Sequence, residues 1–334
     1  MNKKCEVKRV PNKIKFAVAG DPHSEIIHDG PQRMEKFLRA AKEHNVDFII
    51  HTGDLTYPND CTRSDCPKDR MPENVIEAYN YSGKIDHEHS LRLFEGAGIP
   101  FYHVPGNHEF DFSSPEDLLK LYKMPGTYYA FHLCGWHFIV LDCNYFKRAD
   151  GALEHYSRGQ YFLTSDLPYI PMDQLAWLAR ELEENDEPVI LFSHQPLFDK
   201  IGGIKNLADF EAVISEARTR GKDIRMMING HLHADEIEER DGIIYYGINS
   251  MSNMWVGENL AYSGRFPEEI EKLYSSLKYV IPYKEAVYSI VTLDDSGVHV
   301  EGVESKYVQP GPRKIGFKGT ISAKARSWES SWSK

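Results

Sequence analysis

Five short apolar segments of this chain each run into residues that can bind a metal ion. The segments are rich in β-branched residues, as buried strands are, and they span residues 14–19, 46–51, 101–104, 188–193 and 224–228. The polar residues that follow them are Asp21 and His23, then Asp54, Asn107 and His108, His194, and finally His231 and His233. Ligands of α/β proteins bind beyond the carboxyl ends of the strands, so the pattern predicts one shared site at a sheet edge.

Helical periodicity separates these strands. Apolar positions recur at helical spacing in residues 32–45, 173–184 and 206–219. The alternation of strands and helices predicts an α/β fold with a largely parallel sheet. Two hairpin patterns, at residues 129–142 and 287–303, interrupt this alternation and predict a second sheet with antiparallel character.

The chain length of 334 residues accommodates one large domain or two ordinary ones. No domain boundary is visible before the last stretch of the chain, so we expect a single domain over residues 1–307. Residues 308–334 are basic and rich in Gly and Ser. We expect them to form an arm or tail outside the core, or else to make a lattice or dimer contact.

The composition bears on partners and compartment. Lys plus Arg number 39 against 50 Asp plus Glu, and the net charge of −11 at pH 7 disfavours long nucleic acid and anionic lipid. No apolar run approaches the roughly 18 residues that a membrane span needs. The five sparse cysteines, and an N-terminus without an apolar signal stretch, predict reduced thiols in a cytoplasmic protein.

The side chains at the strand ends make a complete ligand set for two divalent cations. Two such ions about 3.5–4 Å apart need one shared anionic ligand and two or three further ligands each. The seven candidates are Asp21, His23, Asp54, Asn107, His194, His231 and His233. A carboxylate suits the bridging position, and a set of oxygen and imidazole ligands without thiolate favours Mn, Fe, Zn or Mg.

The same residues resemble the motifs of the calcineurin-like metallophosphoesterase family. The matching motifs, in family order, are Asp21-Pro22-His23, Gly53-Asp54, Gly106-Asn107-His108-Glu109, Ser193-His194 and Gly230-His231-Leu232-His233. The resemblance spans residues 14–250. It implies a four-layer α/β/β/α sandwich, in which two mixed sheets lie face to face with helices outside.

The resemblance also implies a role for each matched residue. Two ions are implied, with Mn, Fe or Zn expected. One would be held by Asp21, His23 and His233, and the other by Asn107, His194 and His231. Asp54 would bridge the two ions. His108 would lie over the scissile phosphate as a proton donor or charge stabiliser. The implied reaction is in-line attack on phosphorus by a metal-bound hydroxide.

Residues 53–57 also resemble the second motif of purple acid phosphatases, in which a tyrosine ligates ferric iron. The corresponding residue here is Tyr57. That branch lacks the first-motif histidine, which is His23 in this chain, and the two side chains would compete for one coordination position. We expect His23 to be the ligand and Tyr57 to pack or hydrogen bond nearby, with a ferric site as the alternative.

Other histidines and cysteines lie outside these motifs. Strand positions predict that His132 and His137 are core or edge residues. His87 lies in a short His-Glu-His run whose two imidazoles diverge on a helix, so a solvated helix face is expected. Cys61 and Cys66 have no further Cys or His partners nearby, which makes a poor zinc set and indicates an irregular loop.

Substrate choice is expected to come from two segments between the motifs. Residues 144–170 carry several aromatic side chains together with Arg148 and Arg158, and residues 249–284 carry Trp255. An aromatic ring can stack on a base, and an arginine can bind a second phosphate. An ordinary loop packed by its own aromatics explains the first segment equally well, and the length of the second is typical of a lid.

Within the family, the motifs resemble the branch of class III cyclic-nucleotide phosphodiesterases and manganese-dependent diphosphatases. The resemblance implies a phosphodiesterase that acts on a small nucleotide-like ester, with a phosphomonoesterase as the alternative. A non-catalytic, metal-bound interaction scaffold is the alternative from another class. Such scaffolds tend to lose ligands or the histidine at the position of His108, whereas this chain retains all of them.

Overall fold

Two mixed sheets form the centre of the computed structural model, which describes residues 12–57, 75–156 and 166–332. The strands of the first sheet are β1 (Ile14–Ala19), β2 (Phe48–His51), β3 (Phe101–His103), β14 (Ser289–Leu293), β15 (Gly297–Gly302) and β16 (Trp328–Ser331). Those of the second are β4 (Tyr129–Leu133), β5 (Trp136–Val140), β8 (Val189–Ser193), β9 (Ile224–Asn229), β10 (Glu236–Arg240) and β11 (Ile243–Gly247). The strand orders are β16-β15-β14-β1-β2-β3 and β10-β11-β9-β8-β5-β4.

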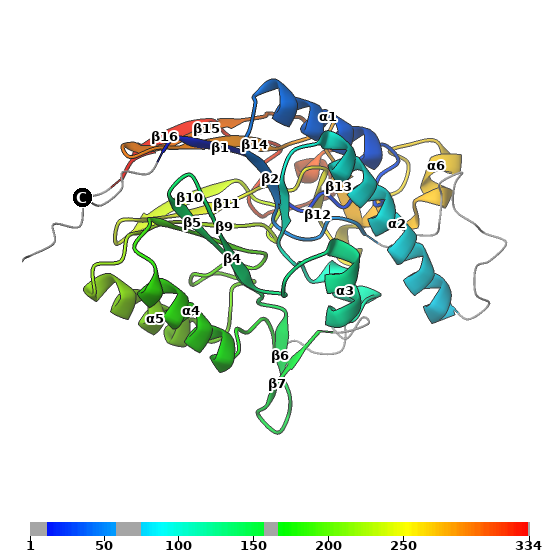
Figure 1. Ribbon diagram of the computed structural model, residues 1–334. Helices are drawn as coiled ribbons and strands as arrows, with labels where there is room; N and C mark the ends of the chain where they lie inside the picture. The colour runs from blue at the N-terminus through cyan, green and yellow to red at the C-terminus, as the bar shows by residue number, and fades with distance from the viewer. Residues whose placement is uncertain (1–11, 58–74, 157–165, 333–334) are drawn as a thin grey trace, which may run out of the picture.

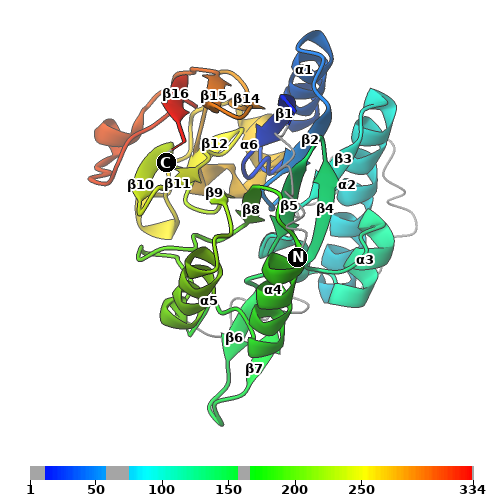
Figure 2. The same ribbon diagram turned by 60° about the vertical axis from the view of Figure 1, so that its left-hand side comes forward.

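Helices cover the outer faces of the two sheets. The α-helices of the described residues are α1 (Gly30–Glu43), α2 (Val75–Ala97), α3 (Pro115–Tyr122), α4 (Met172–Glu184), α5 (Leu207–Thr219) and α6 (Glu268–Leu273). Figures 1 and 2 show α1 and α2 outside the first sheet, and α4 and α5 outside the second. The predicted four-layer α/β/β/α sandwich is therefore confirmed. Two short strand pairs lie beside it, β6 (Tyr145–Lys147) with β7 (Leu153–His155) and β12 (Asn253–Trp255) with β13 (Val280–Pro282).

Aromatic side chains hold the two sheets together. The ring of Phe16 on β1 lies 6.2 Å from Phe138 on β5 and 5.9 Å from Phe192 on β8, measured between centroids. Phe48 on β2 lies 5.1 Å from Phe138. All four side chains are fully buried, and each contributes on the order of 1.5–3 kcal/mol by leaving water. This packing fixes the strands of one sheet against those of the other.

The parallel strands of each sheet bring their carboxyl ends to one edge. Strands β1, β2 and β3 are parallel in the first sheet, and β5, β8, β9 and β11 are parallel in the second. The two predicted hairpins do not form one antiparallel sheet. Instead β4–β5 belongs to the second sheet and β14–β15 to the first, so that each sheet gains antiparallel pairs.

The expectation that residues 308–334 lie outside the core is wrong for the strand near their end. Strand β16 pairs antiparallel with β15 at the edge of the first sheet. Ala325 is fully buried, and Arg326 Nε donates a hydrogen bond of 2.9 Å to Asp235 Oδ2 in the connection before β10. The segment therefore packs on the sandwich, and a domain boundary at residue 307 stays a prediction.

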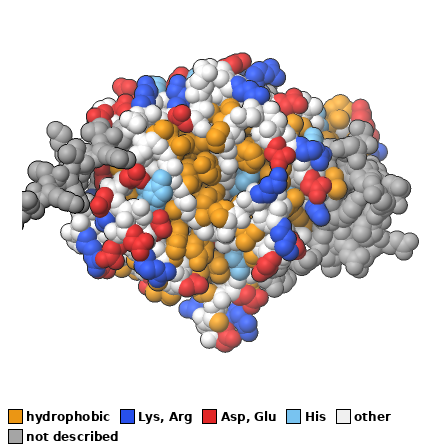
Figure 3. All heavy atoms as spheres, in the orientation of Figure 1, with side chains coloured by type: hydrophobic (Ala, Val, Ile, Leu, Met, Phe, Trp, Pro, Cys, Tyr) orange, Lys and Arg blue, Asp and Glu red, His pale blue; other side chains and the backbone are white. Residues whose placement is uncertain are grey.

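Figure 3 shows the molecule in the orientation of Figure 1, and a band of hydrophobic side chains crosses this face near β4. The edge strands of the two sheets also meet through a stacked pair, Tyr102 of β3 and Phe131 of β4. Their ring centroids are 3.6 Å apart and their planes differ by 5°.

Over the described ranges, the structure contains no helix with the length and apolar character that crossing a bilayer requires.

Candidate metal centre

The first predicted ligand triad comes together where β1 and β9 end. Asp21 and His23 follow β1, and His233 follows β9. The Nε2 atoms of His23 and His233 are 3.3 Å apart, and His233 Nε2 lies 3.5 Å from Asp21 Oδ1. All three side chains are buried, and one ligand atom from each lies within 4.8 Å of the others.

The second triad lies beside the first, on loops that follow β3, β8 and β9. His194 Nε2 is 3.0 Å from Asn107 Oδ1 and 3.2 Å from His231 Nδ1. Asn107 and His194 are buried, and His231 is partly buried. His194 Nε2 thus lies within 3.2 Å of an atom of each of the other two side chains, so the three meet at one place. His194 also forms a cluster of potential metal ligands with Asp21 and Asp54. That the triad shares one cation stays a prediction.

Asp54, which follows β2, contacts both triads. Its Oδ2 atom is 3.2 Å from His194 Nε2 and 3.8 Å from His23 Nε2. Its Oδ1 atom accepts a hydrogen bond of 2.9 Å from the backbone N–H of His108. One oxygen of this carboxylate thus faces a histidine of each triad, which fits a bridging ligand.

The ring orientations of the histidines fit metal ligation. His194 Nδ1 hydrogen bonds to the Thr52 carbonyl at 2.7 Å, and His233 Nδ1 to the Asn253 carbonyl at 3.1 Å. A ring that donates Nδ1–H to a carbonyl presents the lone pair of Nε2, and metal-binding histidines are commonly held in this way. The Nε2 atoms of His194 and His233 then face the carboxylates of Asp54 and Asp21, an arrangement that a positive charge, either a proton or a divalent cation, would stabilise.

The backbone at the ligands is itself unusual. Five of the seven candidates have positive φ angles, which are 41° at Asp21, 44° at His23, 51° at Asp54, 68° at His231 and 49° at His233. This left-handed region costs roughly 1–2 kcal/mol per residue that is not glycine. Strain of this kind concentrates at functional sites, where the surrounding structure holds the side chain in a required direction.

Two motif glycines make room for the carboxylates. A Cβ atom at Gly106 would lie 2.3 Å from Asp54 Oδ1, and one at Gly230 would lie 2.4 Å from Asp21 Oδ2. Both contacts are far shorter than any side chain tolerates. The glycines therefore allow the loops after β3 and β9 to close over the carboxylates that follow β2 and β1.

The charges of the centre depend on one another. Burial alone opposes ionisation of Asp54, but His194 and its neighbours hold the pKa of this carboxyl well below its usual value. Burial likewise lowers the pKa of His194, yet Asp54 raises it to about 10. Burial and the nearby His194 lower the pKa of His231 to about 3. Buried carboxylates thus demand a positive charge here, which a bound cation would supply.

His108 lies beside the two triads and is paired with a residue that the sequence analysis missed. Its Nδ1 atom is 2.6 Å from Oδ2 of the buried Asp111, and its ring is 5.4 Å from that of His23. Burial lowers the pKa of His108, but Asp111 and Asp54 raise it to about 9. The i,i+3 spacing of the pair within the 3₁₀ helix η2 (His108–Asp111) was the available signal for Asp111.

Glu109 joins two of the ligand loops. Its buried carboxylate accepts hydrogen bonds from the backbone N–H groups of Asp54 at 2.9 Å, Leu55 at 2.7 Å and Gly106 at 2.6 Å. The residue stands in a matched motif, but only the folded chain reveals which backbone groups it binds. It positions the loop of Asp54 against the loop of Asn107.

The expectation of a solvated face at His87 is wrong. His87 is fully buried, its ring lies within hydrogen-bond distance of Thr56 Oγ1, and its Nε2 is 3.6 Å from Glu109 Oε1. The reason is that this face of α2 packs on the loop that follows β2. His87 therefore supports the loop that carries Asp54.

Tyr57 packs beside the centre. Its ring lies 5.8 Å from that of His23 and 4.9 Å from that of His108, and its hydroxyl hydrogen bonds to Ser276.

Because the Tyr57 hydroxyl already has this partner, we expect iron-loaded protein, prepared in air, to have no tyrosinate-to-iron absorption band in the visible. Spectra of the wild type and Tyr57→Phe test this expectation. A visible band that disappears in the variant would make Tyr57 a ligand.

The predicted substrate residues have three different outcomes. Trp255 on β12 is 39% exposed, and its ring lies 5.7 Å from Tyr57 and 6.5 Å from His108. Arg148 lies in the β6–β7 hairpin, where Asp150 and Glu154 pair with it at 3.2 and 3.4 Å. Arg158 lies outside the described residues, as do Cys61 and Cys66. The substrate roles of these residues stay predictions.

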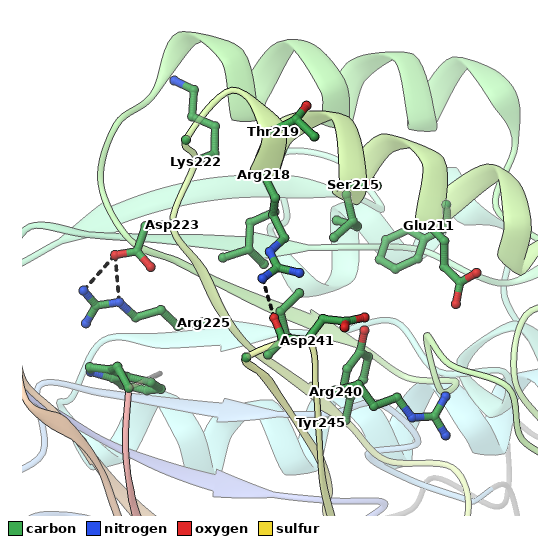
Figure 4. A pocket seen from close by; sticks show the side chains of 17 residues that line it. Glu211, Ser215, Arg218, Thr219, Lys222, Asp223, Arg225, Arg240, Asp241 and Tyr245 are labelled. Atoms are coloured by element: carbon green, nitrogen blue, oxygen red, sulfur yellow. Dashed lines mark hydrogen bonds and ion pairs between the residues drawn. The ribbon is translucent and has the colours of Figure 1, made fainter. Parts of the chain in front are cut away.

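A groove of about 970 Å³ lies at the opposite end of β9 from His231 and His233, between α5 and the hairpin of β10 and β11 (Figure 4). Arg218 hydrogen bonds to the Asp241 carbonyl there, and Arg225 pairs with Asp223 at 2.7 Å. Both cations are therefore already partnered within this part of the structure.

The fold and the clustered ligands define a four-layer α/β/β/α protein with a candidate two-metal centre at its strand ends. The model of the calcineurin-like phosphoesterase family matches residues 14–235. The chain therefore belongs to the calcineurin-like phosphoesterases, a family of metal-dependent hydrolases.

Two known proteins illustrate this relationship. A protein of Fibrobacter succinogenes named "Probable cyclic nucleotide phosphodiesterase" is 25% identical over 176 residues, which cover 50% of this chain and 59% of that protein. The match therefore spans only about three fifths of the length of this relative. A solved dimetal phosphatase from Danio rerio is 14% identical with a TM-score of 0.60, over 88% of this chain and 98% of that one. This second similarity concerns the fold.

Proposed function

We propose that this protein is a binuclear metal-dependent phosphodiesterase that hydrolyses a small, nucleotide-like phosphoric ester. The observation that carries the proposal is the convergence of seven candidate ligands, with one carboxylate facing both triads and His108 beside them. Mn, Fe and Zn are the ions that this set of imidazole and oxygen ligands favours.

Each residue of the centre has a defined part in the proposed reaction. Bound cations would supply Lewis acidity to the phosphate oxygens and lower the pKa of a bound water. His108 Nδ1 is held by Asp111 at 2.6 Å, so we assign donation of a proton to the leaving oxygen to Nε2. Asp111 fixes the ring in this orientation and stabilises its protonated form.

An aromatic wall beside His108 supports a nucleotide-like substrate. Trp255 and Tyr57 lie 5.7 Å apart, and Trp255 is partly exposed next to the centre. A base can stack on an exposed indole while its phosphate reaches the metal ligands. The name of the Fibrobacter succinogenes relative, which matches half of this chain, supports a cyclic nucleotide in particular.

The test is an activity screen of the manganese-loaded protein. Cyclic nucleotides and bis-p-nitrophenyl phosphate are compared with p-nitrophenyl phosphate, and Asp54→Asn protein prepared in parallel reports contaminating activity. We expect the diesters to be hydrolysed faster than the monoester. The opposite preference would make the protein a phosphomonoesterase. Absence of turnover on every ester with two metals bound would support the interaction scaffold.

The aromatic wall gives a separate prediction. Trp255→Ala is expected to raise KM for a cyclic nucleotide about 5- to 100-fold, since stacking a base on an aromatic side chain is worth about 1–3 kcal/mol. The KM for an alkyl phosphodiester without an aromatic group should change little. Tyr262→Ala is the matched control, because Tyr262 is also 39% exposed on the same segment. An equal effect on both substrates would remove Trp255 from base recognition.

A further inference from the structure

A second cluster of metal-binding side chains lies on the second sheet. His132 of the edge strand β4 and His137 of β5 are directly opposite each other in the antiparallel hairpin. Their rings are stacked, with centroids 4.4 Å apart and an angle of 15° between the planes. A direct cross-strand pair of histidines places two imidazoles on one face of the sheet. Because the lone pairs of stacked rings lie in separate planes, binding one ion requires the half-exposed His132 ring to rotate.

Helix α4 and the loop after it add carboxylates to this pair. Glu181 Oε1 lies 3.1 Å from His137 Nε2, and Glu187 Oε2 lies 2.5 Å from His132 Nδ1. One ligand atom from each of His132, His137 and Glu181 lies within 4.8 Å of the other two. In a tetrahedral zinc site with bonds of about 2.0–2.1 Å, neighbouring ligand atoms are about 3.3 Å apart. The separation between His137 and Glu181 is close to that value.

The buried ring of His137 independently indicates that an ion binds here. The side chain is fully buried, yet neither ring nitrogen has a hydrogen-bond partner among the described residues, because Glu181 is near Nε2 without hydrogen-bonding geometry. A buried polar group without a partner costs roughly 1–3 kcal/mol, and native proteins seldom leave one in place. Burial and the neighbouring His132 also lower the pKa of His137 to about 4. The ring is therefore neutral at pH 7, which is the form that binds a metal.

We propose that His132, His137 and Glu181 bind a divalent cation of the zinc type, with Glu187 as a further carboxylate at the site. Two imidazoles and a carboxylate match the ligands of zinc sites, and the cation would satisfy the buried ring and offset the negative charge of the glutamates. The ion would tie the edge hairpin β4–β5 to α4. His132 is 44% exposed, so an ion can enter from solvent.

This site is separate from the candidate metal centre. His137 pairs with Val189 at the start of β8, whereas His194 follows the last residue of that strand. Five residues of strand correspond to about 16 Å. The two sites thus lie at opposite ends of the second sheet, and the inference does not depend on the proposed phosphodiesterase activity.

The test is a count of bound zinc at a fixed, buffered free zinc concentration, by equilibrium dialysis and elemental analysis of the full chain. Two variants remove partly exposed ligands, His132→Ala and Glu181→Gln. We expect each to bind one equivalent of zinc fewer than the wild type, and to lose part of the rise in Tm that zinc produces. Phosphodiesterase turnover of the manganese-loaded variants should equal that of the wild type.

A matched control is His299→Ala. His299 is an exposed strand histidine that lies 3.6 Å from Glu329 in the first sheet, so its removal reports non-specific surface binding. Zinc content of this variant should equal that of the wild type. An unchanged count in both His132→Ala and Glu181→Gln would overturn the proposal. An equal loss in His299→Ala would also overturn it, because the extra zinc would then be bound at the surface without a defined site.

Discussion

Asp54→Asn is expected to lower kcat/KM for the best diester substrate by at least about 10³-fold, which corresponds to about 4 kcal/mol of transition-state stabilisation. The same variant should bind one metal ion or none where the wild type binds two. The reason is geometric, because Oδ2 of Asp54 lies 3.2 Å from His194 and 3.8 Å from His23, one histidine of each triad. An amide at this position has no charge to share between two cations.

The experiment combines steady-state kinetics with elemental analysis of the dialysed protein. Asp235→Asn is the control, since Asp235 is also a buried carboxylate but pairs with Arg326 and belongs to neither candidate triad. This control should keep two ions and a normal rate, so that general damage to the fold is distinguished from loss of a ligand. Two tightly bound ions and normal turnover in Asp54→Asn would contradict the bridging role.

The strand ends could be predicted because the relevant information is local. An apolar strand of four to six residues followed by Gly-Asp or His is visible in the sequence, and parallel strands must bring such ends together. The membership of the two hairpins could not be predicted in this way. Whether β14–β15 joins the first or the second sheet depends on pairing between Phe16 and Val291, residues that are far apart in the chain.

The composition of the C-terminal segment does not show that it joins the sheet, and the reason is physical. Strand β16 is a short edge strand that buries little side-chain surface, so three of its four residues can be polar and the strand still pairs with β15. The buried Ala325 and the ion pair of Arg326 with Asp235 carry the attachment. Neither is recognisable without knowing where Asp235 lies.

The supporting groups of the candidate centre show a similar limit. The seven candidate ligands lie in motifs, but two of them, His194 and His233, are oriented by the backbone carbonyls of Thr52 and Asn253, and a carbonyl has no signature in a sequence. The same holds for His87, whose helical spacing indicated solvent while tertiary packing buried it. Strand positions predict that His132 and His137 are core or edge histidines, and only the fold shows that Glu181 on α4 lies close to both of them.

His108→Ala is expected to lower kcat by roughly 10²–10⁴-fold for a substrate with an alcohol leaving group, while both metal ions remain bound. His108 reaches the centre beside His23, but its Nδ1 is held by Asp111 and not by a ligand triad. The loss should therefore appear in kcat, with metal content equal to that of the wild type. Asp111→Asn should cause a smaller loss, because the imidazole remains but is less well oriented and less readily protonated.

The leaving group distinguishes a proton donor from a residue that only stabilises charge. p-Nitrophenolate leaves without protonation, so His108→Ala should reduce hydrolysis of bis-p-nitrophenyl phosphate far less than hydrolysis of a cyclic nucleotide. An equal reduction for both substrates would assign His108 to charge stabilisation of the phosphate. Loss of a metal ion in His108→Ala would instead make His108 a ligand, and the pair that it forms with Asp111 at 2.6 Å would then orient a ligand.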